Sequence, residues 1–175
     1  MAPMAARTGI SLRGREVLSE KFWLGLALDS VVYLITFCCY GSHLPGDGKF
    51  CEYGSDEYAG AVDRTREPPY VLDDVRRNLV LISIQEACCR RKWGLLAAHV
   101  RTSHVHCVIS ADANPDLVMN GLKCYASHAL NQIEARRIRW ARHGSTRYLP
   151  SQRAVEGAVL YVVEGQGDVL AACVG

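Results

Sequence analysis

The stretch Arg101-Thr-Ser-His-Val-His-Cys-Val-Ile-Ser110 is rich in β-branched and apolar residues, and Asn114-Pro115 follows it as a break. This composition predicts a β-strand. Side chains alternate between the two faces of a strand, so His104 and His106 are expected to point to the same face. Two imidazoles on one face can share a divalent metal ion. Strand histidines of this spacing also occur as ordinary hydrogen-bonded residues, and the pair by itself leaves both interpretations open.

The composition indicates one domain whose positive charge is carried by arginine. The chain has 175 residues, 49% of them hydrophobic, which is enough for one domain with a packed core. The formal net charge is only +2. Of the 20 cationic residues only four are lysines, and the remainder are arginines. Arginine is suited to forked contacts with phosphate and to stacking on bases. The kind of charge, more than its amount, therefore favours nucleic-acid contacts.

Cysteine placement and apolar run lengths predict a soluble, intracellular protein. The eight cysteines include the adjacent pairs Cys38-Cys39 and Cys88-Cys89, and no Cys-x-x-Cys spacing occurs. Free thiols in a reducing cytoplasm are expected, without a disulfide framework or a structural zinc site. The apolar runs 22–28 and 31–37 are separated by Asp29, and neither is long enough to span a bilayer.

The pattern of elements predicts an α+β fold. We expect residues 1–29 to be an N-terminal extension, disordered or a short helix, and residues 30–175 to form the domain. The expected elements are a strand at 31–37, a loop at 41–65, a helix at about 73–92, strands at 95–100 and 101–110, a helix at about 114–133, a short strand at 146–149 and a helix at 151–164. This order predicts a ferredoxin-like or RRM-like antiparallel sheet with helices packed on one face.

Two of these helices have expected apolar faces. The helix at 73–92 is expected to bury Val75, Leu79 and Ile82 and to be broken by Gly94. The helix that begins at Asn114-Pro115 has a capping residue followed by proline at its first position. Its apolar face is expected to contain Val118, Leu122, Tyr125, Ala126, Ala129 and Ile133.

A basic stretch predicts contact with single-stranded nucleic acid. No acidic residue occurs from Ala135 to Val155. Arginines supply charge for phosphates, and interleaved aromatic side chains supply planes for unstacked bases. The alternative is a solvated basic surface. The residues expected to contact nucleic acid are Arg136, Arg137, Arg139, Trp140, Arg142, His143, Arg147 and Tyr148.

The last helix contains a candidate nucleophile, Tyr161. Gly157 lies one turn before it and Gly165 one turn after it. Two glycines beside a tyrosine leave its ring uncovered, which suits a hydroxyl that has to meet a phosphodiester. The alternative is a loosely packed core tyrosine. Tyr125 is a rival nucleophile, although its spacing places it at a core position of its helix.

These residues together resemble the single-tyrosine HUH transposases of bacterial insertion sequences and their repeat-associated, domesticated relatives. The resemblance is carried by His104-Val-His106 on a strand, the arginine-rich segment Arg139–Leu149, and Tyr161-Val-Val-Glu-Gly-Gln166 on a last helix. The segment Tyr33–Gly41 also resembles the first strand of that family. The similarity covers residues 31 to 168 and leaves the first thirty unmatched.

The resemblance implies an enzyme that nicks and joins single-stranded DNA during transposition. His104 and His106 would hold Mg²⁺ or Mn²⁺ against the scissile phosphate, and Tyr161 would attack to give a 5′-phosphotyrosine and a 3′-hydroxyl. The implied partner is single-stranded DNA with hairpin ends. A homodimer or a monomer is implied, with Tyr161 acting in its own subunit or in the partner, in the bacterial cytoplasm near the nucleoid.

Two positions depart from the family pattern. The family usually has Gln or Asn as a third metal ligand one turn after the tyrosine, where this chain has Gly165. Glu164 lies on nearly the same helix face as Tyr161 and is the first substitute, and Gln166, past the expected helix end, is the second. Ser103 precedes the histidine pair where family members often have Asn.

Other functions are weighed against this one. A degenerate relative would bind hairpin DNA or RNA without cutting, and the departure at Gly165 motivates that alternative. A histidine-triad enzyme would need a further histidine where Cys107 and Val108 stand. A two-histidine phosphoesterase would need two His-x-Thr/Ser motifs, and only His143-Gly-Ser145 resembles one.

Overall fold

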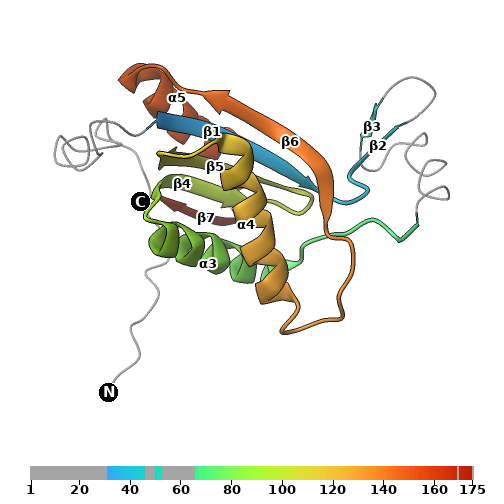
Figure 1. The fold of residues 1–175 in the computed structure, drawn as a ribbon. Helices are drawn as coiled ribbons and strands as arrows, with labels where there is room; N and C mark the ends of the chain where they lie inside the picture. The colour runs from blue at the N-terminus through green and yellow to red at the C-terminus, as the bar shows by residue number, and fades with distance from the viewer. Residues whose placement is uncertain (1–30, 46–49, 53–65, 169, 175) are drawn as a thin grey trace.

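The computed structural model describes residues 31–45, 50–52, 66–168 and 170–174 (Figure 1). The predicted extension 1–29 and much of the predicted loop 41–65 lie outside these ranges. Within that loop a small hairpin pairs β2 (His43–Pro45) with β3 (Phe50–Glu52).

The core of the fold is an antiparallel five-stranded sheet with the order β6-β1-β5-β4-β7. Its strands are β1 (Val31–Cys39), β4 (Gly94–Val100), β5 (His104–Ala111), β6 (Trp140–Tyr148) and β7 (Ala171–Val174). The helices are α3 (Asp74–Arg91), α4 (Pro115–Leu130) and α5 (Gln152–Val163). With the small β2-β3 hairpin set aside, the chain runs in the order β1-α3-β4-β5-α4-β6 before α5. This is a ferredoxin-like order, and it confirms the predicted α+β class.

The sheet has helices on both of its faces. Helices α3 and α4 pack on one face, as predicted, and α5 lies across the other (Figure 1). Alternation along the strands separates the two cores: Phe37 and Cys107 face α3 and α4, whereas Leu34 and Val108 face α5. The histidine face is therefore covered in part by the helix that carries Tyr161.

Each helix begins at a side-chain cap, and the sequence predicts the one at Asn114. The side chain of Asp73 accepts from the Arg76 amide at 2.9 Å, and that of Asn114 accepts from the Asp116 amide at 2.9 Å. Ser151 caps α5 through the Ala154 amide at 3.3 Å. The end of α3 differs from the prediction, because Lys92 adopts a left-handed conformation with φ 57° and terminates the helix before Gly94.

The predicted apolar face of α3 is wrong at two of its three positions. Val75 is 67% exposed and Ile82 is 51% exposed, whereas Leu79 packs against the core, whose fully buried α3 residues include Val80, Ile84 and Ala87. Residues 79–82 are all apolar, so the spacing of apolar residues does not define which side of the helix is buried. Packing against α4 and β4 decides which side is buried. Ile133 is likewise 52% exposed, because α4 ends at Leu130.

The two edge strands also differ from the sequence prediction. Strand β6 is nine residues long, whereas only residues 146–149 were expected to be extended. Strand β7 was not predicted and pairs antiparallel with β4. An edge strand is paired on one side only and is incompletely buried. When it carries charged residues, or is as short as β7, its sequence therefore shows only a weak alternation of apolar and polar residues.

Two glycines provide a matched test of this packing. A methyl group on Gly144 would meet Met119 Sδ and lie 2.5 Å from the Thr36 carbonyl oxygen, whereas one on Gly157 would have nothing within 4 Å. We expect Gly144→Ala to lower the free energy of unfolding by about 1–3 kcal/mol through overpacking. Gly157→Ala should raise it by about 0.5–1 kcal/mol through helix propensity. Urea unfolding measures both, and equal effects would contradict the packing described.

Candidate active site

His104 and His106 lie on the sheet face that α5 covers. His106 is paired across the sheet with Thr36 of β1 on one side and with His99 of β4 on the other, and Thr36 is paired with Ser145 of β6. Residues directly opposite one another on neighbouring strands share a face. Ser145, Thr36, His106 and His99 therefore form a line across the sheet, which we call the polar row.

His106 is buried, with one ring nitrogen bonded and one without a partner. Its Nδ1 lies 2.8 Å from the Thr36 hydroxyl, and its ring is 6% exposed. Its Nε2 is buried and has no hydrogen-bond partner among the residues that the structure describes. The His104 ring is 4.8 Å from the His106 ring, and His104 Nδ1 lies 3.1 Å from the Ser103 hydroxyl.

Burial lowers the pKa of His106 to about 4, and the neighbouring His104 acts in the same direction. The imidazole is therefore neutral at pH 7, and a neutral imidazole is the form that binds metal ions. The Gln166 amide acts on this pKa in the opposite direction, so its side chain lies close to His106, although it makes no hydrogen bond to Nε2.

Tyr161 lies beside this pair in the same chain. Its ring centroid is 5.7 Å from that of His106, with the ring planes inclined at 74°, and the residue is 47% exposed. Its position is fixed by the next residue, because His99 Nδ1 bonds the Val162 carbonyl at 2.9 Å. His99 Nε2 accepts from the Leu170 amide at 3.2 Å, which ties the chain after α5 to β4.

The chain around Gly165 passes close to the tyrosine. A methyl group on Gly165 would lie 2.8 Å from the Tyr161 carbonyl oxygen and 3.1 Å from its Cα. The backbone at this position therefore leaves no room for a side chain. Gln166 follows, and its side-chain amide lies 3.5 Å from the Tyr161 carbonyl oxygen.

The two substitutes for a third ligand are placed differently. Glu164 is an exposed residue at the end of α5, whereas Gln166 is partly buried. Within the described part of the chain, no group of three or more His, Cys, Asp or Glu side chains could hold a metal ion. A carboxylate of Glu164 is thus not gathered with His104 and His106, and Gln166 is the better-placed oxygen donor.

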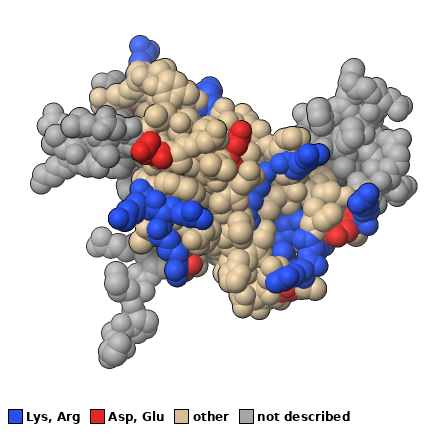
Figure 2. Space-filling model, in the orientation of Figure 1, with Lys and Arg blue, Asp and Glu red and all other residues tan. Residues whose placement is uncertain are grey.

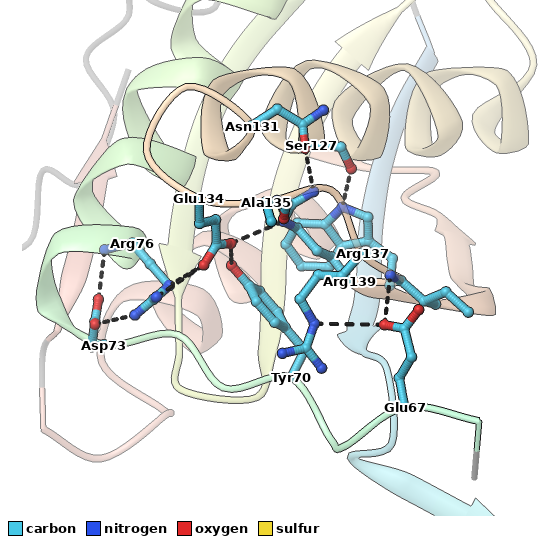
Figure 3. Close-up of polar contacts among 12 residues, drawn as sticks. Glu67, Tyr70, Asp73, Arg76, Ser127, Asn131, Glu134, Ala135, Arg137 and Arg139 are labelled. Carbon is cyan, nitrogen blue, oxygen red and sulfur yellow. Dashed lines mark hydrogen bonds and ion pairs between the residues drawn. The ribbon is translucent and has the colours of Figure 1, made fainter.

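Part of the predicted nucleic-acid surface is used inside the protein (Figure 3). Arg139 is 3% exposed, and it bonds Glu134 at 3.1 Å and Asn131 at 2.7 Å. Trp140 packs edge-on against Phe37 at 5.1 Å and donates to Ser127 at 2.9 Å. These contacts join the start of β6 to α4 and the segment after it, and they leave Arg139 buried and Trp140 partly exposed.

Glu134 is the centre of this buried network. Tyr70, Arg76 and Arg139 all contact its carboxylate, the Arg76 guanidinium at 2.9 Å (Figure 3). Hydrogen bonds from these three groups hold its pKa below the usual value. Arg137 belongs to the same region, since it donates to the Pro68 carbonyl at 2.6 Å and stacks 5.1 Å from the Tyr70 ring.

The other predicted contact residues remain exposed. They are Arg136 in the segment before β6, and Arg142, His143, Arg147 and Tyr148 on β6 itself. Arg147 is paired with Leu34, which faces α5, so Arg147 lies on the same sheet face as the histidines. Tyr148 lies on the opposite face, where it meets Tyr33 at 6.4 Å.

The face that carries α3 and α4 has basic side chains at its two ends (Figure 2). They gather near the C-terminal end of α3, where Arg90 and Arg91 lie, and around the segment that joins α4 to β6. Between them the surface is largely uncharged. Positive charge is therefore not confined to the stretch 135–155.

Two residues near the site were missed by sequence reasoning. Thr36 and His99 belong to the polar row, and only strand register places them beside His106. Lys123 of α4, on the opposite sheet face, is 8% exposed and donates to the Ala141 and His143 carbonyls at 3.0 and 3.3 Å. Its pKa is lowered by burial. Tyr125, the rival nucleophile, packs with the α3–α4 core on the face opposite to the histidines.

Comparison with known proteins defines the fold and not yet the activity. No protein-family model matches the chain, and no curated protein matches it. In structure it is similar to a REP-associated tyrosine transposase bound to a REP hairpin, with a TM-score of 0.51 and 13% identity. The match covers 77% of this chain and 66% of that chain. The likeness establishes a shared fold.

Over the described residues, no helix is long and apolar enough to cross a membrane.

The lowered pKa of His106 predicts a pH dependence of stability in metal-free protein. The folded-state pKa is about 4 against 6.5 for an unperturbed histidine, so the unfolded chain binds the proton first. The free energy of unfolding is therefore undiminished by His106 above about pH 6.5, and it decreases as the pH falls from there toward about 4. We expect that, in urea titrations, the free energy of unfolding of His106→Asn decreases less than that of the wild type over this pH range. The exposed His128→Asn should keep the wild-type slope, and a wild-type slope in both variants would contradict the assignment.

Proposed function

We propose that the protein nicks and joins single-stranded DNA through a covalent bond to Tyr161, as a metal-dependent transposase or a relative of one. The observation that carries the proposal is the half-exposed Tyr161 ring beside His106, whose buried Nε2 has no hydrogen-bond partner among the described residues. A fold similar to that of a REP-associated tyrosine transposase bound to a REP hairpin supports the same conclusion.

The donor set of two imidazoles and one amide oxygen fits a divalent cation with mixed nitrogen and oxygen ligands. A buried nitrogen without a partner costs about 1–3 kcal/mol unless a ligand satisfies it. His104, His106 and the amide oxygen of Gln166 would hold Mg²⁺ or Mn²⁺, and solvent and phosphate oxygens would complete the coordination. Such an ion supplies Lewis-acid polarisation of a phosphoryl oxygen.

The covalent step uses groups of this chain. The Tyr161 phenolate oxygen forms a bond to the scissile phosphorus as the bond to the 3′ oxygen breaks, which leaves a 5′-phosphotyrosine and a 3′-hydroxyl. The phenolic proton passes to solvent and a proton returns to the departing 3′ oxygen. An unperturbed tyrosine has a pKa of about 10, so the cationic site has to favour the phenolate. A second DNA end rejoins by the reverse reaction.

The DNA strand is proposed to approach from the β6 edge. Arg147 is exposed on the face that carries the histidine pair, and Ser145 lies at the end of the polar row. Arginine binds phosphate through a forked pair of donors. The strand would thus pass over Arg147 and Ser145 to reach His106 and Tyr161.

One chain contains all the groups invoked. Tyr161 and His106 lie together without a second subunit, so we propose that the tyrosine acts in its own chain, in a monomer or a homodimer. Hairpin-bearing single strands in the bacterial cytoplasm are the proposed substrate. A relative that binds hairpins without cutting is the alternative outcome of the following experiment.

The first test is covalent capture. The protein is incubated with Mn²⁺ and a single strand from the flanks of its gene that contains an imperfect palindrome. We expect a denaturation-resistant protein–DNA adduct that is absent in Tyr161→Phe and in chelator. Tyr125→Phe, which removes a hydroxyl on the opposite face, should form the adduct at the wild-type level. Retained binding without any adduct in wild type would establish the non-cleaving alternative.

The second test concerns the path of the strand. Arg147→Gln should weaken binding of this DNA several-fold. It should also reduce the slope of log affinity against log salt by about 0.7, the value for one lost phosphate contact on a single strand. Arg90→Gln removes the same charge from α3, on the other face, and should leave the slope unchanged. Fluorescence anisotropy at a series of salt concentrations measures both, and equal slopes would refute the proposed path.

A further inference from the structure

We propose that Thr36 is a positioning residue that fixes the tautomer of His106. Its hydroxyl oxygen accepts a hydrogen bond from His106 Nδ1–H, which leaves the Nε2 lone pair directed into the site. The inference rests on the proposed function, because a lone pair on Nε2 is of use only if a cation is bound there.

Strand pairing places the two groups directly opposite each other. Thr36 and His106 are partners in the antiparallel register of β1 and β5, and the hydroxyl lies 2.8 Å from Nδ1. Both side chains are on the face that α5 covers. β1 is flanked by β5 and β6, so the position of Thr36 is fixed by two strand pairings. The hydroxyl is therefore held where it meets only one ring nitrogen of His106.

His99, the next residue of the polar row, shows what a structural histidine needs here. It is 0% exposed, and both of its nitrogens are bonded to backbone groups. The Val162 carbonyl can only accept, so Nδ1 carries the proton, and Nε2 accepts from the Leu170 amide. His99 is thus satisfied without any ligand. His106, on the adjacent strand and equally enclosed, has a partner for Nδ1 alone.

The proposed cation decides the direction of the Thr36 hydrogen bond. If the hydroxyl donated to Nδ1, then Nε2 would carry a proton, and no cation could bind it. If Nδ1–H donates to the hydroxyl, Nε2 presents a lone pair that a cation satisfies. Outer-shell partners of this kind orient metal-binding histidines and raise their basicity. Ser103, whose hydroxyl lies 3.1 Å from His104 Nδ1, is placed to act on the second ring in the same way.

The tautomer can be measured without metal and without DNA. In ¹⁵N spectra of chelator-treated protein at pH 7, the imidazole of His106 is assigned by its loss in His106→Asn. We expect a protonated Nδ1 and an unprotonated Nε2 in wild type. Thr36→Val should shift the ring toward the Nε2–H form, and Thr36→Ser should restore the wild-type pattern. A wild-type ring with the proton on Nε2 would overturn the inference.

Affinity for Mn²⁺ gives the second readout. We expect Thr36→Val to weaken Mn²⁺ binding by about 10–100-fold, as for other outer-shell partners, and Thr36→Ser to recover most of it. The matched control is Ser83→Ala, which removes a buried hydroxyl that bonds the Val80 carbonyl at 2.7 Å on α3. It should lower stability to a similar degree without changing Mn²⁺ binding. Unchanged binding in Thr36→Val would overturn the inference.

The two proposals fail in different ways. An Nδ1–H tautomer that depends on Thr36, together with no DNA adduct in wild type, would support the role of Thr36 and refute the cleavage reaction. A DNA adduct formed by a protein whose His106 carries its proton on Nε2 would refute the role of Thr36 alone.

Discussion

The packing of α5 against the histidine face of the sheet is the interaction on which the candidate site depends. The helix is held by Val155, Val159 and Val162, which bury their side chains against the sheet, and by the bond between the Val162 carbonyl and His99. Because Tyr161 immediately precedes Val162, the same contacts that bury one side of the helix end present the tyrosine to His106. The position of Tyr161 and the stability of this second core therefore depend on the same contacts.

This arrangement places polar groups in a region that would otherwise be apolar. The polar row crosses the sheet next to Val108 and Leu34, and each of its two histidines has a lowered pKa through burial. A buried polar group is tolerated when its hydrogen bonds are made, and His99 meets that condition. His106 meets it at one nitrogen only. The two neighbouring histidines therefore differ in how many of their ring nitrogens are hydrogen-bonded within the described residues.

The arginine-rich stretch combines structural and exposed residues. Arg139 and Trp140 hold β6 to α4 through Glu134, Asn131 and Ser127, and Lys123 holds the carbonyls at the start of the same strand. With these contacts made, the later part of β6 can run along the sheet edge with Arg147 exposed. Spacing in the sequence could not separate these roles, because a forked cation is equally suited to a buried carboxylate and to a phosphate.

The sequence by itself determined the fold class, the helix starts and the shared face of His104 and His106, because these follow from local caps and from the two-residue period of a strand. It also indicated Tyr161 as a candidate nucleophile. Only the tertiary structure decided the buried face of α3, the strand β7, and the exposure of Glu164 beside a partly buried Gln166. Thr36 and His99 belong to the same class, since their place beside His106 arises from strand register. Register and helix docking bring together residues about 70 positions apart, and no local pattern in the chain encodes such a distance.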